Sequence, residues 1–282
     1  MKKVVIIGVG LMGGSLGMAL RKVKKNSTRK YEIFGIGRNV RSLQLAKSKG
    51  AVDGFSSEIK DVSGADIAVI CQPVDMIADT YKKISKYLSK ETVVTDIGSI
   101  KLNIETEING IIRKNKNSPS FVGCHPMAGI ERSGIQFAKS DLYNNACVII
   151  TGRNSKNTKI AAGIWKDVGC KILYMTAKEH DEIVAFTSHL PHLIAFSFYN
   201  MFLTKHKKNS NVDKVKAGSF ESITRVAKSS PDIWMPIFLN NKKNLQILTD
   251  EFCSMLKMFV KKIDNKKSLE KILRKSIKNE NQ

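Results

Sequence analysis

The chain has 282 residues, 42% of them hydrophobic, and it carries a formal net charge of +22. That length and apolar content suffice for one large domain, or two of ordinary size, with a real core. The basic residues crowd segments that are rich in Asn and Ser and poor in the aromatic side chains that stack on bases. We therefore interpret the charge as a lysine-rich surface that helps to attract an anionic substrate, and we expect no nucleic-acid partner.

The five cysteines are scattered, and no two of them form a CxxC pair. This pattern is typical of free thiols in a reducing compartment and indicates no zinc or other metal site. The uncharged run from Val4 to Leu20 superficially resembles a secretory signal, but it contains five glycines and leads into basic residues without an obvious cleavage site. No later segment is apolar and long enough to span a bilayer, so we expect a cytoplasmic protein with no membrane partner.

The first predicted elements are a buried strand over Val4–Ile7 and a helix that begins near Met12. Between them lies a GxGxxG pattern, which in this context is typical of a dinucleotide-binding turn. The glycines allow a tight turn and a close approach to a pyrophosphate, and the start of the helix directs free N–H groups at the phosphates. The alternative is a glycine-rich turn that merely packs well. The candidate cofactor residues are Gly8, Gly10, Leu11, Met12 and Gly13.

The second predicted strand, Ile33–Ile36, bears on the choice of cofactor. An acidic residue usually follows this strand in NAD-binding folds, where it binds the ribose 2′-hydroxyl. Here Gly37 and Arg38 follow instead, and a guanidinium can hold a 2′-phosphate through a bidentate contact. We therefore favour NADP, with NAD possible. In the alternative reading Arg38 simply stacks on adenine and the protein accepts either cofactor.

The strand pattern continues to about residue 175 and then changes to helical periodicity. We expect an α/β fold with a doubly wound, Rossmann-type dinucleotide-binding domain over residues 1–175. An all-helical substrate-binding and dimerisation domain would follow over 176–282, with a frayed or solvated basic tail from about Lys266. The further predicted strands are Ile67–Cys71, Val93–Asp96, Phe121–Gly123, Cys147–Thr151 and Lys171–Met175.

Three polar segments follow predicted strands, at the edge where an open α/β sheet binds its ligands. Gln72 and Pro73 would place backbone against the nicotinamide-side ribose. Ser99 presents a hydroxyl beside a flexible glycine. His125 would lie at a strand-to-turn junction, which is a position typical of a catalytic residue.

The helical half holds two more candidate segments, Thr187–His192 and Ser219–Arg225. Each also has a purely structural interpretation. Pro191 can kink a helix, Arg225 can cap a helix or pair on the surface, and His189 and His192 can be satisfied core histidines, which is the commoner fate.

Five segments in this order, GVGLMGGS, TDIGSIK, GCHPMAG, SHLPH and SITRVA, resemble the prephenate/arogenate dehydrogenases of tyrosine biosynthesis. The resemblance runs from Lys3 to about Val260. It implies an NAD(P)-dependent enzyme that moves hydride from ring C4 of its substrate to the nicotinamide while the ring carboxylate leaves as CO₂. Prephenate would give 4-hydroxyphenylpyruvate, and arogenate would give tyrosine. It also implies a homodimer formed through the helical halves.

The resemblance assigns roles to individual residues of this chain. His125 matches the base that accepts the proton of the C4 hydroxyl, and Ser99 matches a serine that contacts the same region and helps to orient that histidine. Ser188 and His192 match substrate-contacting positions. Arg225 matches the arginine that holds a substrate carboxylate, for which a guanidinium is well suited.

The resemblance covers two further residues of this chain, and the chain departs from the family pattern in two places. Glu131 matches an acidic position near the pocket mouth in some relatives, where it would favour the ammonium group of arogenate, and Trp234 matches a tryptophan near the site. Ser222 stands where many relatives carry an acidic residue, so a gating ion pair is in doubt. Met235-Pro236 replaces a more polar pair.

Other functions fit the dinucleotide fold. One is another NADP-dependent dehydrogenase with a helical second domain, such as a β-hydroxyacid dehydrogenase or pyrroline-carboxylate reductase, which would use a lysine or lack the segment around His125. Another is a non-catalytic NADP-binding regulatory protein. The length leaves no room for a fused chorismate mutase or an amino-acid-binding regulatory domain, so the family reading predicts a monofunctional enzyme.

Overall fold

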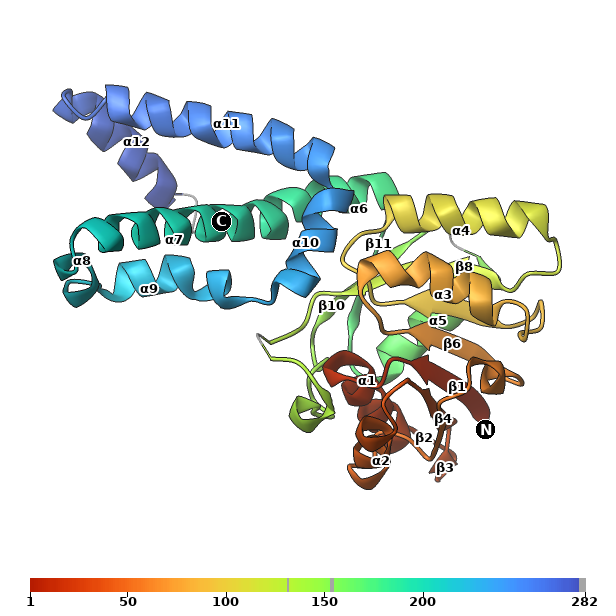
Figure 1. Ribbon diagram of the computed structural model, residues 1–282. Coiled ribbons are helices and arrows are strands. Elements are labelled where there is room, and N and C mark those ends of the chain that lie inside the picture. Colours follow the sequence, from red (N-terminus) through yellow and green to blue (C-terminus); the bar gives the residue numbers. More distant parts are fainter. Residues whose placement is uncertain (131, 153–154, 279–282) are drawn as a thin grey trace.

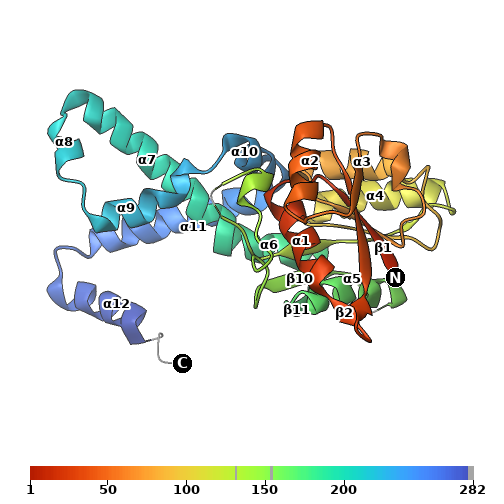
Figure 2. The same cartoon turned by 90° about the horizontal axis from the view of Figure 1, so that it is seen from below.

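The protein consists of a sheet-containing half and a helical arm that extends from it (Figure 1; Figure 2). The computed structural model describes residues 1–130, 132–152 and 155–278. Glu131 lies outside the described residues. The two halves meet where the last long strand leads into the first helix of the arm.

The main sheet has six strands, all parallel, in the order β5-β4-β1-β6-β7-β8. The order reverses direction beside the first strand, which is the arrangement of a doubly wound dinucleotide-binding fold. Its strands are β1 (Lys2–Ile7), β4 (Tyr31–Ile36), β5 (Gly54–Ser56), β6 (Ile67–Ile70), β7 (Val93–Asp96) and β8 (Ser120–Val122).

Helices cover both faces of this sheet, because its strands are apolar on both sides. In β1, Val4 and Ile6 join one core cluster, whereas Val5 and Ile7 join the other. The first cluster packs against α1, α2 and α5, and the second packs against α3 and α4. The predicted fold class is therefore confirmed. The helices are α1 (Leu11–Lys22), α2 (Val40–Ser48), α3 (Ile77–Ile84), α4 (Leu102–Lys114) and α5 (Lys156–Asp167).

A second, three-stranded sheet holds His125 and corrects the sequence interpretation. We expected His125 at a strand-to-turn junction, but it lies inside β9 (Cys124–Pro126), antiparallel to β10 (Cys147–Thr151). β10 pairs on its other side with β11 (Lys171–Met175). Gly123 separates β8 from β9, and a side chain there would collide with Thr151 and Glu105. The glycine thus lets the chain leave the main sheet and enter the second one.

Short elements connect these strands. A basic hairpin of β2 (Lys24–Lys25) and β3 (Thr28–Arg29) turns through Asn26 and Ser27, which have positive φ angles of 49° and 66°. Single helical turns are η1 (Ile59–Val62), η2 (Val74–Met76) and η3 (Ile135–Phe137).

The arm is entirely helical and begins at a well-formed cap. Thr176 and Glu179 form a capping box at the start of the first helix, α6. Pro191 lies where the π-helical turn passes into α7, inside a continuous helical run, and having no N–H it cannot donate a hydrogen bond to the preceding turn. The elements are α6 (Ala177–Val184), the π-helical turn η4 (Ala185–His189), α7 (Leu190–Lys208), α8 (Asn211–Lys214), α9 (Gly218–Thr224), η5 (Arg225–Lys228), α10 (Pro231–Asn240), α11 (Lys242–Lys261) and α12 (Lys266–Lys278).

The expected tail from about Lys266 is not frayed, because α12 forms there, but most of its described side chains are exposed, as the solvated alternative predicts. Asn265 accepts a hydrogen bond from the backbone N–H of Ser268 and so satisfies one free donor at the start of the helix. Leu269, Leu273 and Ile277 recur at helical spacing among the basic residues, which gives the segment an apolar stripe. Because the segment is rich in lysine, its composition alone indicated a solvated tail and did not reveal this helical stripe.

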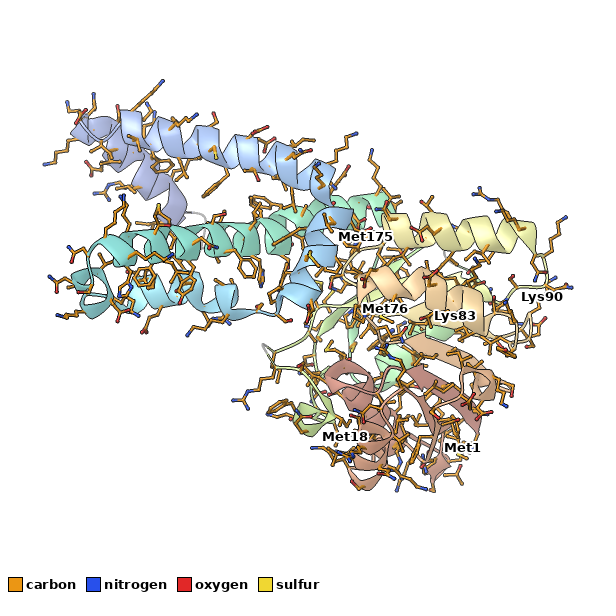
Figure 3. The ribbon with its side chains drawn as sticks, viewed as in Figure 1. Met1, Met18, Met76, Lys83, Lys90 and Met175 are labelled. Atoms are coloured by element: carbon orange, nitrogen blue, oxygen red, sulfur yellow. The ribbon has the colours of Figure 1, made fainter. Side chains whose placement is uncertain are left out.

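The halves contact each other through several elements. α6 packs against α4 and β10, and α10 contacts η2. Met76 and Met175 lie near this junction (Figure 3). Among the described residues, no helix combines the length and apolar character needed to cross a membrane.

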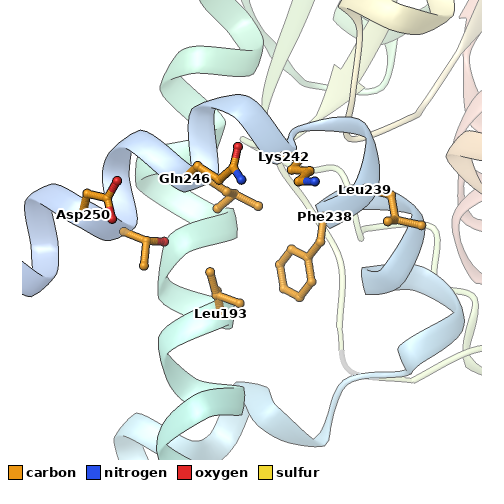
Figure 4. A pocket seen from close by; sticks show the side chains of 8 residues that line it. Leu193, Phe238, Leu239, Lys242, Gln246 and Asp250 are labelled. Carbon is orange, nitrogen blue, oxygen red and sulfur yellow. The ribbon is translucent and has the colours of Figure 1, made fainter.

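Apolar side chains remain exposed along the arm, including Phe186, Leu239 and Met255 at 63%, 69% and 53%. A hollow of about 650 Å³ opens among α7, α10 and α11 (Figure 4). None of the predicted site residues lines it. Its walls are Leu193, Phe238, Leu239, Lys242, Leu245, Gln246, Thr249 and Asp250.

Candidate active site

The glycine loop after β1 has the shape expected of a dinucleotide cradle. Gly8 has a φ of +97°, and a Cβ there would collide with the carbonyl of Cys71. A Cβ at Gly13 would collide with the carbonyl of Gly8, so this glycine lets α1 pack tightly on the loop. A Cβ at Gly10, by contrast, would meet no protein atom within 4 Å. The space at Gly10 is therefore available to a ligand.

The start of α1 is equally suited to phosphate. Its N-cap is Gly10, no side chain caps the first turn, and no acidic residue lies in that turn. The turn is held in place because the carbonyl of Met12 accepts a 2.9 Å hydrogen bond from Tyr143 Oη, while Leu11 is buried. Free N–H groups and the positive end of the helix dipole together favour an anion. The residues present thus fit the pyrophosphate of a nicotinamide dinucleotide.

The end of β4 presents a cation and no nearby acid. Arg38 is exposed, and Asn39 caps α2 by accepting a 3.0 Å hydrogen bond from the N–H of Ser42. Asp53, the acidic residue closest along the chain beyond α2, is paired with Arg21 and Arg29.

The loop after β6 carries the other two predicted cofactor residues. Gln72 accepts a 2.5 Å hydrogen bond from the hydroxyl of Thr80, and Pro73 precedes the turn η2. Both residues lie at the carboxyl edge of the main sheet, beside the glycine loop, because the N–H of Cys71 donates to the carbonyl of Ile7.

His125 lies in a buried chain of polar groups. It is 8% exposed, and its Nδ1 lies 2.8 Å from Nε2 of His180. The Nδ1 of His180 in turn lies 2.7 Å from Asp181 Oδ1. Burial, followed by the proximity of His180, Lys101 and His189, holds the pKa of His125 well below its usual range. The imidazole is therefore neutral near pH 7 and can accept a proton.

A fully buried ion pair supports the backbone around His125. The Lys101 ammonium lies 2.5 Å from Asp96 Oδ2, and both side chains have no solvent exposure. Asp96 also accepts hydrogen bonds from the N–H groups of Gly98 and Cys124, at 2.8 and 3.0 Å. One carboxylate thus ties β9 to the loop that carries Ser99, the segment before α4.

Ser99 is half-buried on that loop, between Gly98 and Ile100. The resemblance assigned it a part in orienting His125, whereas the partner that the structure shows at His125 Nδ1 is His180. A role for Ser99 beside the reacting groups stays a prediction.

The arm brings three predicted substrate residues together. His192 Nδ1 donates a 2.9 Å hydrogen bond to the carbonyl of Ser188. The His192 ring also stacks on Trp234 with a 3.5 Å centroid separation and a 21° interplanar angle. Arg225 is exposed at the start of η5, a turn that contacts α7. Ser188, His192 and Trp234 are thus in mutual contact through His192, and Arg225 lies on a turn that packs against the same helix.

His189 fits the structural alternative instead. It is buried, and its Nδ1 accepts a 3.1 Å hydrogen bond from the side-chain amide of Asn241. Burial lowers the pKa of His189 to about 4, so the ring is neutral. The same Asn241 amide donates to the carbonyl of Asp181 at 2.8 Å, which links α6 to the start of α11.

The sequence interpretation missed His180 and Asp181. A sequence signal was available, because His180 and Val184 are four residues apart and so lie on one face of a helix, which the structure shows to be buried. Polar residues on an otherwise buried stripe require partners and so merit attention. The extra residue of the π-helical turn η4 disturbs the simple 3.6-residue spacing, which concealed the pattern.

Comparison with known proteins now decides the family. A family model described as "Prephenate dehydrogenase, nucleotide-binding domain" matches residues 18–174, and one described as "Prephenate dehydrogenase, dimerization domain" matches residues 176–277. The chain belongs to the prephenate dehydrogenase family. The expected fold, with its dinucleotide half and its helical half, agrees with this assignment.

Individual relatives agree with the family assignment. The chain is 31% identical to the cyclohexadienyl dehydrogenase of Zymomonas mobilis over 261 residues, which cover 91% of this chain and 86% of that protein. It is 29% identical to the prephenate dehydrogenase of Lactococcus lactis over 86% of this chain and 65% of that enzyme. The chain thus spans slightly less than two thirds of the Lactococcus protein.

Among solved structures, the chain is similar to prephenate dehydrogenase from A. aeolicus in complex with hydroxyphenyl propionate and NAD+. The TM-score is 0.90 at 33% identity, covering 100% of this chain and 98% of that one. The fold is also shared with a 3-hydroxyisobutyrate dehydrogenase of Mycobacterium tuberculosis, with a TM-score of 0.55 at 14% identity over 90% of this chain and 88% of that one. That weaker likeness concerns the fold alone and does not favour the alternative dehydrogenase reading.

Proposed function

We propose that this protein catalyses the oxidative decarboxylation of prephenate or arogenate with a nicotinamide dinucleotide, in the biosynthesis of tyrosine. The observation that carries the proposal is the buried, neutral His125. Its neighbour Cys124 is tied to Asp96 at the carboxyl end of β7, the edge of the parallel sheet at which the open glycine loop follows β1. The relatives named above are prephenate and cyclohexadienyl dehydrogenases, which supports the same reaction class.

The reaction requires a base at the substrate hydroxyl. His125 Nε2 takes the proton of the C4 hydroxyl as the C4–O bond gains double-bond character, and that proton returns when the product phenol forms. A nicotinamide dinucleotide held by the glycine loop would supply the acceptor for the C4 hydrogen and its electron pair. The electron pair of the broken bond to the ring carboxylate enters the ring, so CO₂ leaves and the ring becomes aromatic. Atoms and electrons balance without a further oxidant.

The arm supplies the groups that hold the anionic substrate. We assign Arg225 to a substrate carboxylate, and Ser188 and His192 to direct contact with the substrate. Trp234 fixes the plane of His192 by stacking, which pre-organises that contact. Ser99 completes the set on the sheet side. We propose that Glu131, which lies outside the described residues, contacts the side chain of the substrate, where it would favour the ammonium group of arogenate.

We propose NADP as the preferred cofactor, with NAD as a weaker alternative. The support is the exposed Arg38 after β4, where an acid would otherwise bind the ribose 2′-hydroxyl. Gly8, Gly10, Leu11, Met12 and Gly13 would hold the pyrophosphate. Gln72 and Pro73 would contact the nicotinamide side.

We further propose the assembly and location of the protein. Residues 1–175 would bind the dinucleotide, and residues 176–282 would pair with a second copy to form a homodimer. The exposed apolar side chains of the arm and the match to a dimerisation domain support this pairing. The free thiols support a cytoplasmic location.

One assay tests the reaction, the substrate and the cofactor together. Purified protein is mixed with prephenate or arogenate, each with NAD or NADP, and the absorbance of the reduced nicotinamide is followed. We expect a clear rate, fastest in an NADP mixture. No rate in any of the four mixtures, with dinucleotide binding intact, would overturn the proposed reaction.

A further inference from the structure

The polar chain that ends at His125 begins at backbone groups that can only donate. The carboxylate of Asp181 accepts hydrogen bonds from the N–H of Lys101 at 2.9 Å and from the N–H of Leu102 at 3.0 Å. These are the first N–H groups of α4, where the helix dipole also favours a negative charge. Asp181 is 3% exposed, and these two donors fix its carboxylate in place as a hydrogen-bond acceptor.

The direction of the remaining hydrogen bonds follows from this anchor. Because the Asp181 carboxylate accepts, His180 must carry its proton on Nδ1. His180 is completely buried, and burial lowers its pKa despite the neighbouring carboxylate. A neutral His180 has a lone pair on Nε2, so His125 must donate to it from Nδ1.

We propose that His180 and Asp181 are positioning residues that hold His125 in the tautomer with its proton on Nδ1, leaving Nε2 as the acceptor. The use of Nε2 as the base rests on the proposed function. The tautomer itself rests only on the hydrogen bonds described here.

Within the described part of the chain, the other charged and titratable groups that influence His125 are engaged with partners of their own. Lys101 and His189 face His125, but the Lys101 ammonium is held by Asp96 and His189 is engaged with Asn241. His180 is influenced by Lys101, Asp96 and Asp181. If His180 carried its proton on Nε2, it would donate to Nδ1 of His125. A neutral His125 would then carry its own proton on Nε2, and this nitrogen could not accept the substrate proton.

The first test reads the tautomer directly by ¹⁵N NMR of histidine-labelled protein, which needs no turnover. The His125 signals are assigned by their loss in His125→Asn. We expect the pattern of a neutral ring with its proton on Nδ1 in the wild type and in His180→Gln, whose side-chain carbonyl can accept at the place of Nε2. His180→Leu removes that acceptor and should give a mixture of tautomers. A wild-type ring protonated on Nε2 would overturn the proposal.

The second test is kinetic. We expect His180→Leu to lower kcat about 100-fold or more, as loss of a group that fixes a catalytic tautomer does, with KM changed only a few-fold. His180→Gln should recover a large part of the loss, which a merely structural role would not predict. The matched control is His206→Leu on α7, which should leave both constants unchanged.

The outcomes separate this proposal from the proposed reaction. Equal kcat in His180→Leu and wild type would overturn the positioning role while leaving the reaction intact. A wild type without turnover would overturn the reaction, yet the NMR pattern would still decide the tautomer. If His180→Leu fails to fold, the wild-type spectrum and His180→Gln still decide it.

Discussion

At the residue scale, the neutral state of His125 depends on its burial. A histidine in water is half-charged near its ordinary pKa of about 6.5 and would be a poorer acceptor below it. In the fold, β9 buries the ring, and His180 occupies its Nδ1. One nitrogen is thereby used for structure and the other remains for chemistry.

Replacing His125 by Asn should remove the base while keeping a polar group of similar reach. We expect kcat to fall about 100- to 10,000-fold, because general base catalysis typically contributes that much. KM for the substrate should change only modestly, since Arg225, Ser188 and His192 are untouched. Steady-state rates with the preferred substrate and cofactor measure both constants. Near-normal turnover would remove His125 from the mechanism.

The pKa of His125 also predicts the acid limb of the pH profile. Only the neutral ring can accept the proton, so activity is lost as pH falls through this pKa. Because burial holds the pKa well below 6.5, kcat should stay constant on lowering the pH through 6.5 and decline only in more acidic buffer. Rates across this range measure the limb, and Trp fluorescence at each pH verifies that the protein is folded. An acid midpoint at or above 6.5 would contradict the prediction.

At the element scale, the loop between β1 and α1 contains two glycines that the fold itself requires and one, Gly10, that we propose leaves room for a ligand. Gly8 and Gly13 are needed by the chain itself, whereas the space at Gly10 is filled by no protein atom within 4 Å of an added Cβ. Gly10 has a φ of −93° and a ψ of −148°, so its φ lies outside the left-handed region that favours glycine. The two kinds of glycine therefore respond differently to the same substitution.

Gly10→Ala should leave stability within about 0.5 kcal/mol of the wild type, because the new methyl group meets no neighbour. It should weaken dinucleotide binding about tenfold or more, since the methyl occupies space that the pyrophosphate needs. Thermal unfolding and calorimetric titration with NADP measure the two effects. Gly110→Ala, also without a neighbour within 4 Å but in the middle of α4, is the control and should bind NADP normally. Unchanged NADP affinity in Gly10→Ala would contradict this assignment.

The secondary-structure elements show which features of the fold can be predicted from the sequence. Short apolar runs and glycine spacing were enough to predict the main strands of the six-stranded sheet and the glycine turn between β1 and α1, because these signals are local. The departure of β9 into a second sheet depends on a contact of Gly123 with Thr151, 28 residues away, and no local pattern encodes it. The partner of His125 likewise comes from 55 residues downstream.

At the scale of the whole molecule, the arm exposes more apolar surface than a self-contained helical domain needs. Phe186, Leu239 and Met255 are each more than half exposed. The hollow among α7, α10 and α11 interrupts the same surface (Figure 4). Surfaces of this kind are typical of an interface between subunits.

A charge at the rim of this hollow should therefore weaken the proposed homodimer. Leu239→Glu places a carboxylate where the wild-type side chain is 69% exposed, so the single chain should fold normally. We expect a shift from dimer to monomer at micromolar concentration in analytical ultracentrifugation. Leu45→Glu on α2, which adds the same charge at an exposed apolar position of the sheet half, is the control. Equal association in Leu239→Glu and the wild type would place the interface elsewhere.

The position of His180 along the chain has a consequence for biosynthesis of the protein. During translation, the glycine loop, β9 and all other strands leave the ribosome before α6 does. A nascent chain can thus present His125 before the groups that set its proton exist, and any product truncated ahead of residue 180 lacks them altogether. The proton of His125 is therefore not expected to be fixed before α6 docks, so that chains terminated ahead of residue 180 stay inert.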